Sequence, residues 1–353
     1  MSGFDLHSLV RENIRELKPY RSARDDFDKG ILLDANENSM GSPIESDLEL
    51  NRYPMPLQEE LRAKIAAYRK VKPSQVFTGV GSDEAIDLLF RIFCIPGHDR
   101  ILINPPTYGM YKVSAKINDV QVDEVLLDEN FQLRPDKILE QVTTQTKLIF
   151  ICSPNNPTAN SIKRDDIIKV LSSFNGIVVV DEAYIDFSGT GSMAAMTDEY
   201  PNLVVLQTLS KAFGLAGIRL GIAIASEEII SYMLKVKAPY NINKLTSKAA
   251  IEAFDHVDKV QENVRRILDE RKRMEDMLAE IEEVDEVFPS DANFLVFRVK
   301  NALKVYEVLA AEGVVVRYRG NEPGCENGLR LTIGTPEEND FFIHKLQEIL
   351  KKI

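Results

Sequence analysis

Six short apolar runs separated by helix-like segments constrain the fold of this chain more than any other feature. The runs lie in RILIN, VDEVLL, KLIFIC, GIVVVD, NLVVLQT and IRLGIAIA, between residues 100 and 225. Their length and β-branched content are typical of strands that are buried on both faces. Helical patterns such as RDDIIKVLSSF alternate with them. The sequence therefore predicts an α/β fold with a mostly parallel, doubly wound sheet.

The pattern changes after residue 240, which predicts a second, smaller domain. Apolar residues recur at helical spacing over 245–281, as expected for one long helix or two joined helices. Strand-like NFLVFRV, VVVRY and GLRLTIG follow, and Thr335, Pro336 and Glu338 form a predicted capping box at the start of the last helix. We expect three parts: an N-terminal arm that also completes the small domain (1–40), a large α/β domain (41–240) and a small α+β domain (241–353).

The composition excludes several classes of protein. The 353 residues are 44% hydrophobic and 28% charged, and the formal net charge is −12 without a long run of lysine or arginine. This acidic balance argues against a nucleic-acid or anionic-membrane partner. The first residues are too charged for a signal peptide, and no apolar run reaches membrane-spanning length. We therefore expect a cytoplasmic protein that acts on small molecules.

Several common motifs are missing from the sequence. The three cysteines lack a CxxC pair, so we expect reduced thiols that pack in the core. The four histidines are scattered without ligand spacing, and no metal site is expected. No glycine is followed by lysine, which excludes a Walker A loop, and a lipase-type GxSxG is absent too. The chemistry must therefore come from other residues.

Lys211 is the first candidate for that chemistry. It lies in TLSKAFGLAGIRLG, between a serine and small apolar residues, with Arg219 eight positions later. A partly desolvated ammonium has a lowered pKa and becomes a nucleophile. The alternative is a surface lysine at a strand-to-helix turn, whose stem packs on the protein while its charge stays in water.

Polar clusters follow three of the predicted strands, in SPNNPT, DEAY and TLSK. Ligands of open α/β sheets bind beyond the carboxyl ends of the strands. We therefore expect Asn156, Asp181, Tyr184 and Lys211 to face one crevice. Taken singly, the asparagine is explained by a turn and the aspartate by a cap on the next segment. Together, an amide, a carboxylate, a phenol and an isolated lysine indicate a site.

A glycine-containing turn, GVGSDEAID, precedes a helical pattern and is a candidate phosphate site. Gly79, Gly81 and Ser82 can present backbone N–H groups and a hydroxyl to an anion. An ordinary capped helix is the alternative, and the turn lacks the third glycine of a dinucleotide fingerprint. A nucleophilic lysine, a strand-end aspartate and a phosphate site without a metal point to pyridoxal phosphate as the cofactor.

At these residues the chain resembles the fold-type I pyridoxal-phosphate aminotransferases. SPNNPT, VVDEAYIDF and TLSKAFGLAGIRLG carry that resemblance. DANEN, NRYP, PPTYGMY and GLRLTIGT, together with LKPYRSAR near the N-terminus, are similar to the histidinol-phosphate aminotransferases within this group. Two positions depart from the pattern. Ser39 stands where proline is usual, and Ala159 replaces the glycine of NPTG, from which we expect a backbone with negative φ.

The resemblance implies roles for individual residues around the cofactor. Lys211 would form the Schiff base and move the proton, and Asp181 would pair with the pyridine nitrogen. Tyr184 and Asn156 would bond to the phenolic oxygen of the ring, and Tyr108 would stack on it. Further cofactor contacts, mainly to the phosphate, would come from the remaining matched positions, which are Gly81, Ser82, Asp83, Ser210 and Arg219.

The resemblance also implies a homodimer with shared active sites. Tyr53 would reach the cofactor phosphate of the neighbouring subunit. Arg330 would grip a substrate anion, and Tyr20, Asn36 and Arg317 would help to bind the substrate. Because Arg317 and Arg319 alternate with Tyr318 in VVVRYR, we expect both arginines on one face of a strand, although a solvated edge strand also explains Arg319.

The function implied is the transfer of an amino group from L-histidinol phosphate to 2-oxoglutarate in histidine biosynthesis. Two rivals keep the fold: an aromatic amino-acid aminotransferase, and a decarboxylase of an O-phosphorylated amino acid. Pocket walls of similar character serve all three, so the sequence separates them poorly. A non-catalytic sensor that binds the same cofactor, and a substrate-binding protein without cofactor, are more distant alternatives.

Overall fold

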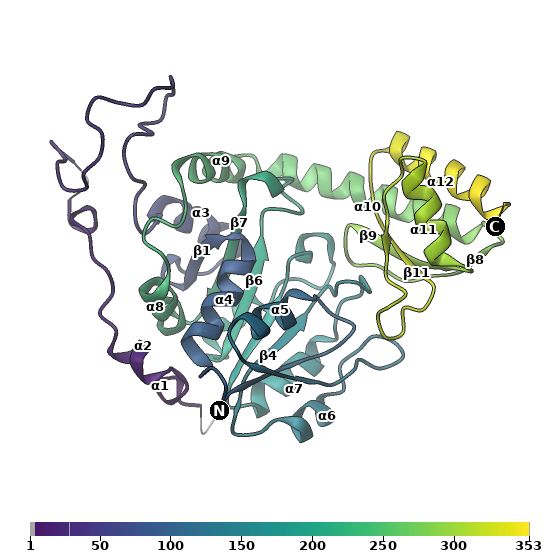
Figure 1. Cartoon of the computed structure of the whole chain (residues 1–353), viewed down its shortest axis with the longest axis horizontal. Helices are drawn as coiled ribbons and strands as arrows, with labels where there is room; N and C mark the ends of the chain where they lie inside the picture. The colour runs from purple at the N-terminus through teal and green to yellow at the C-terminus, as the bar shows by residue number, and fades with distance from the viewer. Residues whose placement is uncertain (1–3, 28, 353) are drawn as a thin grey trace.

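Two sheets joined by one long helix make up the computed structural model, which describes residues 4–27 and 29–352 (Figure 1). The larger sheet has the strand order β1-β7-β6-β5-β4-β2-β3. Strand β7 runs antiparallel to both of its neighbours, and the other four pairs are parallel. The predicted mostly parallel α/β sheet is therefore confirmed. Its strands are β1 (Val76–Val80), β2 (Arg100–Ile103), β3 (Gln121–Glu124), β4 (Thr146–Cys152), β5 (Ile177–Asp181), β6 (Leu203–Thr208) and β7 (Leu220–Ala225).

Helices cover both faces of this sheet because its strands are apolar on both sides. Leu148 and Phe150 of β4 belong to one buried cluster, whereas Ile149 and Ile151 belong to the other. Residues of α4, α5 and α8 complete the first cluster, and residues of α3, α6, α7 and α9 contribute to the second. The helices are α3 (Glu59–Arg69), α4 (Gly81–Phe93), α5 (Met110–Ile117), α6 (Pro135–Gln141), α7 (Arg164–Ser173), α8 (Glu227–Val236) and α9 (Lys244–Asp255).

The smaller domain packs its helices against an antiparallel sheet of order β10-β11-β9-β8. The capping box at Thr335 and Glu338 is present as predicted. The predicted strand VVVRY is shorter than expected, because only Arg317 and Tyr318 pair with β11. The elements are α10 (Val257–Ala279), β8 (Val284–Val287), β9 (Phe294–Val299), α11 (Ala302–Ala311), β10 (Arg317–Tyr318), β11 (Gly328–Thr332) and α12 (Pro336–Leu350).

Helix α10 belongs to both domains. The helical pattern over 245–281 forms two helices, α9 and α10, which meet at His256. Val260 and Val264 of α10 lie in the core of the large domain, whereas Met274 and Leu278 lie in the core of the small domain. In Figure 1 the helix runs from the large sheet to the small one. None of the described helices is long and apolar enough to cross a membrane.

The N-terminal segment packs on the large domain. Leu6, Val10 and Ile14, in or beside α1 (Leu6–Leu9) and α2 (Glu12–Glu16), lie in the same buried cluster as α4 and α8. We expected residues 1–40 to include part of the small domain, and these three contacts are with the large domain instead. Five 3₁₀ helices complete the described elements: 23–25, 73–75, 185–187, 194–198 and 216–218.

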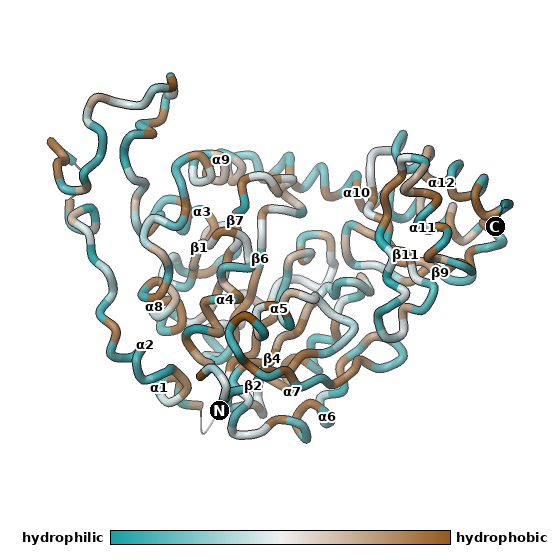
Figure 2. The backbone as a smooth tube through the Cα atoms, in the orientation of Figure 1, coloured by the Kyte–Doolittle hydropathy of each residue, from teal (hydrophilic) through white to brown (hydrophobic). Residues whose placement is uncertain are grey.

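Residues 17–57 form an extended segment between α2 and α3 that reaches beyond the sheet and its helices (Figure 1, upper left). Within it, the buried Glu37 carboxylate accepts from Arg24 at 2.6 Å and from the half-buried Arg52 at 2.8 Å, which forms a small ionic cluster. Hydrophobic positions recur along the segment in Figure 2. The exposed apolar side chains include Phe27, Ile31, Leu33, Met40 and Ile44.

Candidate active site

A cavity of about 620 Å³ lies at the carboxyl ends of the parallel strands, between the two domains. The sheet order brings the ends of β4, β5 and β6 together, and β10 and β11 of the small domain close the other side. Twelve of the residues predicted from the sequence line it: Gly81, Ser82, Asp83, Tyr108, Asn156, Asp181, Tyr184, Ser210, Lys211, Arg219, Arg317 and Arg330. Thr107 and Thr208, which received no role in the sequence analysis, also line it. So do Cys152, which we expected to pack in the core, and Arg319, which we expected on the same strand face as Arg317.

Lys211 faces this cavity from the turn after β6. Its Nζ atom lies 5.5 Å from the centre of the Tyr184 ring. Burial lowers the pKa of the Lys211 amine, the charges of Arg330 and Arg219 lower it further, and Asp181 acts in the opposite direction. The amine is therefore uncharged at a lower pH than an ordinary lysine, as a nucleophile or general base requires.

Asp181 is buried at the end of β5 and lines the cavity. Tyr111 donates its hydroxyl to Oδ2 at 2.8 Å, and the backbone N–H of Ala183 donates to Oδ1 at 3.2 Å. Burial raises the pKa of Asp181 to about 6, and the two hydrogen bonds oppose that rise. A cationic group of a bound ligand would stabilise the negative charge of this buried carboxylate.

The start of α4 and the loop before β7 form a cup that suits a phosphate. Gly81 has a φ of +70°, and a Cβ atom there would lie 2.7 Å from Nη2 of Arg219. A Cβ atom on Gly221 would lie 2.0 Å from the backbone nitrogen of Ser82. The Gly81 N–H donates to the Arg219 carbonyl at 2.8 Å. No side chain among the described residues caps the start of α4, so the following N–H groups and the helix dipole are available to an anion. The donors present fit the phosphate of the predicted cofactor.

Ser210 adds a hydroxyl to this cup from the end of β6. Its backbone N–H donates to Oγ1 of Thr208 at 3.1 Å, and the Thr208 hydroxyl donates to the Ser210 hydroxyl at 3.0 Å. Thr208 thereby fixes the turn that carries both Ser210 and Lys211. Sequence analysis assigned it no role, because a threonine in an apolar strand carries no signal of its own.

Arg330 links the two domains across the cavity. Its Nη1 donates to Oδ1 of Asn156 at 2.6 Å, and its guanidinium lies 5.2 Å from the centre of the Phe294 ring. Burial lowers the pKa of Arg330, and the charges of Arg319 and Arg317 lower it further. Three guanidinium groups with few acidic neighbours form a site for a substrate anion.

Comparison with known proteins decides the family. The model of the family "Aminotransferase class I and II" matches residues 27–346. The chain belongs to this family. It is 49% identical over 352 residues to the histidinol-phosphate aminotransferase of Flavobacterium johnsoniae, with 98% of this chain and 99% of that protein covered. The corresponding protein of Cytophaga hutchinsonii is 49% identical over 351 residues, with 99% of each covered.

A solved structure agrees with this assignment. The histidinol-phosphate aminotransferase of Clostridium acetobutylicum superposes with a TM-score of 0.79 at 28% sequence identity, over 86% of this chain and 92% of that one. The family and the fold predicted from the sequence are thus confirmed. Among the described residues, no group of three or more histidine, cysteine, aspartate or glutamate side chains is arranged to hold a metal ion.

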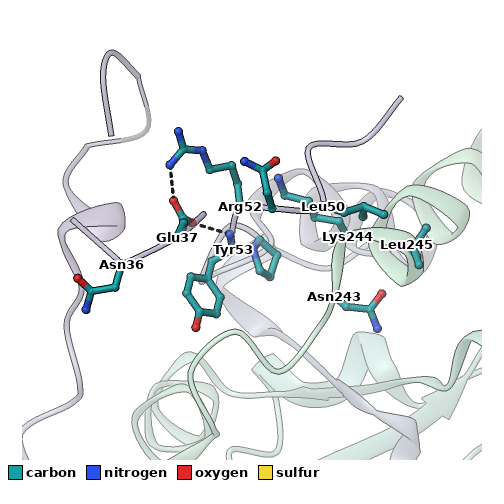
Figure 3. Close-up of a pocket in the computed structure, with 10 residues that line it drawn as sticks. Asn36, Glu37, Leu50, Arg52, Tyr53, Asn243, Lys244 and Leu245 are labelled. Atoms are coloured by element: carbon teal, nitrogen blue, oxygen red, sulfur yellow. Dashed lines mark hydrogen bonds and ion pairs between the residues drawn. The ribbon is translucent and has the colours of Figure 1, made fainter. Parts of the chain in front are cut away.

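Three residues predicted for the site of this aminotransferase lie outside the 620 Å³ cavity. Asn36 and Tyr53 line a separate cavity of about 360 Å³ (Figure 3). There the backbone N–H of Tyr53 donates to Glu37 at 2.7 Å, and its ring stacks on Tyr240 with the centres 4.7 Å apart. Tyr20 lines a further pocket beside α8. All three belong to the extended segment 17–57.

The two departures from the family pattern differ in their surroundings. Ala159 has a φ of +68°, so the expected negative φ is wrong. The residue is fully buried, its N–H donates to Asn155 at 2.9 Å, and its carbonyl accepts from Asp291 at 2.8 Å. These contacts hold alanine in a conformation that glycine adopts more readily. Ser39 lies exposed in a turn of the extended segment.

Replacing Asp181 by asparagine should stabilise this aminotransferase when it is free of cofactor. A carboxyl whose folded-state pKa is raised stabilises the fold at low pH, and this contribution is lost as pH rises through about 6. Relative to the ordinary aspartate pKa of 3.8, the ionised carboxylate costs at most about 3 kcal/mol at pH 8 and about half of that at pH 5. Denaturant unfolding at the two pH values measures the gain. A gain that is equal at both would exclude ionisation of Asp181 as its cause.

Proposed function

We propose that this aminotransferase transfers the amino group of L-histidinol phosphate to 2-oxoglutarate, yielding imidazole-acetol phosphate and L-glutamate. The observation that carries the proposal is a single cavity lined by a lysine whose pKa is lowered, a buried carboxylate and three arginines of the small domain. The similarity to two histidinol-phosphate aminotransferases over nearly the whole chain supports the choice of substrate and its place in histidine biosynthesis.

The residues present fit pyridoxal 5′-phosphate as the cofactor. Arg219, Ser210 and the backbone N–H groups of Ser82 and Asp83 in the first turn of α4 would hold its phosphate. Gly81, whose own N–H donates to the Arg219 carbonyl at 2.8 Å, would leave room for it. Asp181 would face the ring nitrogen, Asn156 and Tyr184 would face the ring oxygen, and Tyr108 would cover one face of the ring. When bound, the cofactor supplies an electron sink that stabilises negative charge on the substrate carbon.

Lys211 would attach the cofactor and then move the proton. Its lowered pKa makes the uncharged amine easier to reach than in an ordinary lysine, and the uncharged Nζ would accept a proton from the α-carbon of the substrate. Asp181 stays ionised while it faces a cationic ring nitrogen, because the opposite charge favours the carboxylate. The aspartate thereby keeps the proton on that nitrogen during each half of the reaction.

The arginines would serve both substrates in turn. L-Histidinol phosphate brings a phosphate and 2-oxoglutarate brings carboxylates, and a guanidinium group presents a fixed fork of donors to either anion. Arg330 is already oriented by Asn156. Arg317 and Arg319 lie on the same side of the cavity, and Arg317 is the more exposed of the two.

We also propose a cytoplasmic homodimer in which each subunit completes the site of the other. Tyr53, Tyr20 and Asn36 lie on the extended segment, away from the cavity of their own chain. Apolar side chains of that segment are exposed in the single chain, as expected for a surface that a second copy covers. Transfer of the segment to the neighbouring subunit would bring these residues to the second cavity.

The decisive experiment is a visible spectrum of the purified protein before and after addition of each candidate substrate. L-Histidinol phosphate should bleach the band of the bound cofactor far more readily than L-histidinol or L-phenylalanine does. A stronger response to L-phenylalanine would assign the enzyme to aromatic amino acids instead. Release of carbon dioxide from an O-phosphorylated amino acid would favour the decarboxylase. Absence of any band after reconstitution would contradict the cofactor assignment.

A further inference from the structure

Tyr111 is a buried polar side chain for which the proposed reaction has no use. It lies in the first turn of α5 and is 0% exposed. Its hydroxyl donates to Oδ2 of Asp181 at 2.8 Å. Its ring stacks on Phe150 of β4 with the centres 4.7 Å apart, and it meets the Tyr108 ring edge-on at 5.5 Å. One side chain thus contacts both the carboxylate and the aromatic ring that are assigned to the cofactor.

We propose that Tyr111 is a positioning residue that sets the Asp181 carboxylate and the Tyr108 ring for the pyridine ring of the cofactor. The proposal depends on the cofactor assignment above but not on the identity of the amino donor. Tyr111 does not line the cavity and would not contact the cofactor. It acts through the two residues that would.

The geometry explains why a tyrosine is needed at this position. The Asp181 carboxylate accepts only one other hydrogen bond from the described residues, from the N–H of Ala183 to the opposite oxygen. Without the Tyr111 hydroxyl, Oδ2 loses its donor in a buried environment, and the carboxylate is free to turn about its last side-chain bond. The stack on Phe150 restrains the tyrosine ring, and the Cys152 thiol is a second polar neighbour of its hydroxyl.

The same hydrogen bond has an electrostatic effect. It favours the ionised form of Asp181 and lowers the pKa that burial raises. Lys211 also lowers that pKa and Asp83 raises it. The other titratable groups that face Asp181 from neighbouring elements are Cys152, Tyr108 and Tyr184. Removing the hydroxyl should therefore raise the pKa of Asp181, so that on acidification the carboxylate becomes protonated at a higher pH.

Tyr111→Phe tests the proposal, because it removes only the hydroxyl. The cofactor-free protein is titrated with pyridoxal 5′-phosphate and with an analogue whose ring nitrogen is replaced by carbon. We expect the variant to bind pyridoxal 5′-phosphate about tenfold more weakly, since a hydrogen bond to a charged group is lost. Binding of the analogue, which makes no bond to Asp181, should change less than twofold. The pH below which pyridoxal 5′-phosphate binding weakens should rise.

Phe93→Leu is the matched control, since it removes a buried aromatic ring from the same cluster and leaves the Tyr111 hydroxyl and its stack on Phe150 in place. It should affect the two ligands equally and leave the pH dependence unchanged. Equal weakening of both ligands by Tyr111→Phe would mean that the residue only supports the fold, and no change in either would also overturn the proposal. These titrations use no histidinol phosphate, so a wrong amino donor would leave their outcome unaltered.

Discussion

Lys211→Ala should abolish measurable turnover while the variant still binds the cofactor. Proton transfer by a positioned base contributes a factor of roughly 10²–10⁴, and loss of the covalent attachment adds to this. The contacts that we propose for Asp181, Arg219 and the start of α4 do not involve the Lys211 side chain, so binding should survive. Stopped-flow absorbance with L-histidinol phosphate measures the half-reaction, and equilibrium dialysis measures the bound cofactor.

Lys116→Ala is a suitable control for this prediction. Lys116 is exposed on α5 and takes no part in the cavity. Its replacement should leave the rate unchanged. A small primary amine added to Lys211→Ala should restore part of the rate, because it fits the space that the side chain vacates. Turnover at the original rate in Lys211→Ala would refute the assignment of the base.

Arg330→Gln should reduce kcat/KM for both substrates by roughly 30- to 4,000-fold. Truncating one member of a buried charged pair costs about 2–5 kcal/mol, and both substrate anions are expected to bind here. The loss should appear mainly in KM, since the arginine binds a group remote from the reacting carbon. Asn156 loses its 2.6 Å partner at the same time. Steady-state kinetics with each substrate varied separately measures how much of the loss lies in KM and how much in kcat.

Arg266→Gln provides the comparison for Arg330. Arg266 is exposed on α10 and pairs only with Glu262, one turn away. Such pairs contribute little to stability, so kinetics and unfolding should both stay as in the parent protein. A KM for either substrate that is unaffected by Arg330→Gln would place the anion of that substrate on Arg317 or Arg319 instead.

The sequence predicted the large sheet and most of the cavity because both depend on local patterns. Strand β4 alternates between two cores, and a run such as LIFIC that is apolar at every position requires this arrangement. Asn156, Asp181 and Lys211 each follow such a run, so the parallel sheet brings them together. The antiparallel direction of β7 was not foreseen, because a strand buried on both faces has the same apolar pattern in either direction.

Other features depend on contacts between distant parts of the chain. In the sequence, Tyr111 looks like any other aromatic residue of an amphipathic helix. Its hydroxyl donates to Asp181, which lies 70 positions later in the chain, and no local pattern indicates this contact. The positive φ of Ala159 is imposed by Asn155 and by Asp291 from the small domain. The short ladder at Arg317 reflects pairing with β11, which no pattern within VVVRY determines.

Helix α10 is a rigid connection between the two domains that form the cavity. With 23 residues it is about 34 Å long, and each of its ends is embedded in a different core. The distance between Lys211 and Arg330 is therefore governed by the stiffness of a helix as well as by the loops at the cavity mouth. A bend at the middle of α10 would shift β11, and with it Arg330, relative to Lys211.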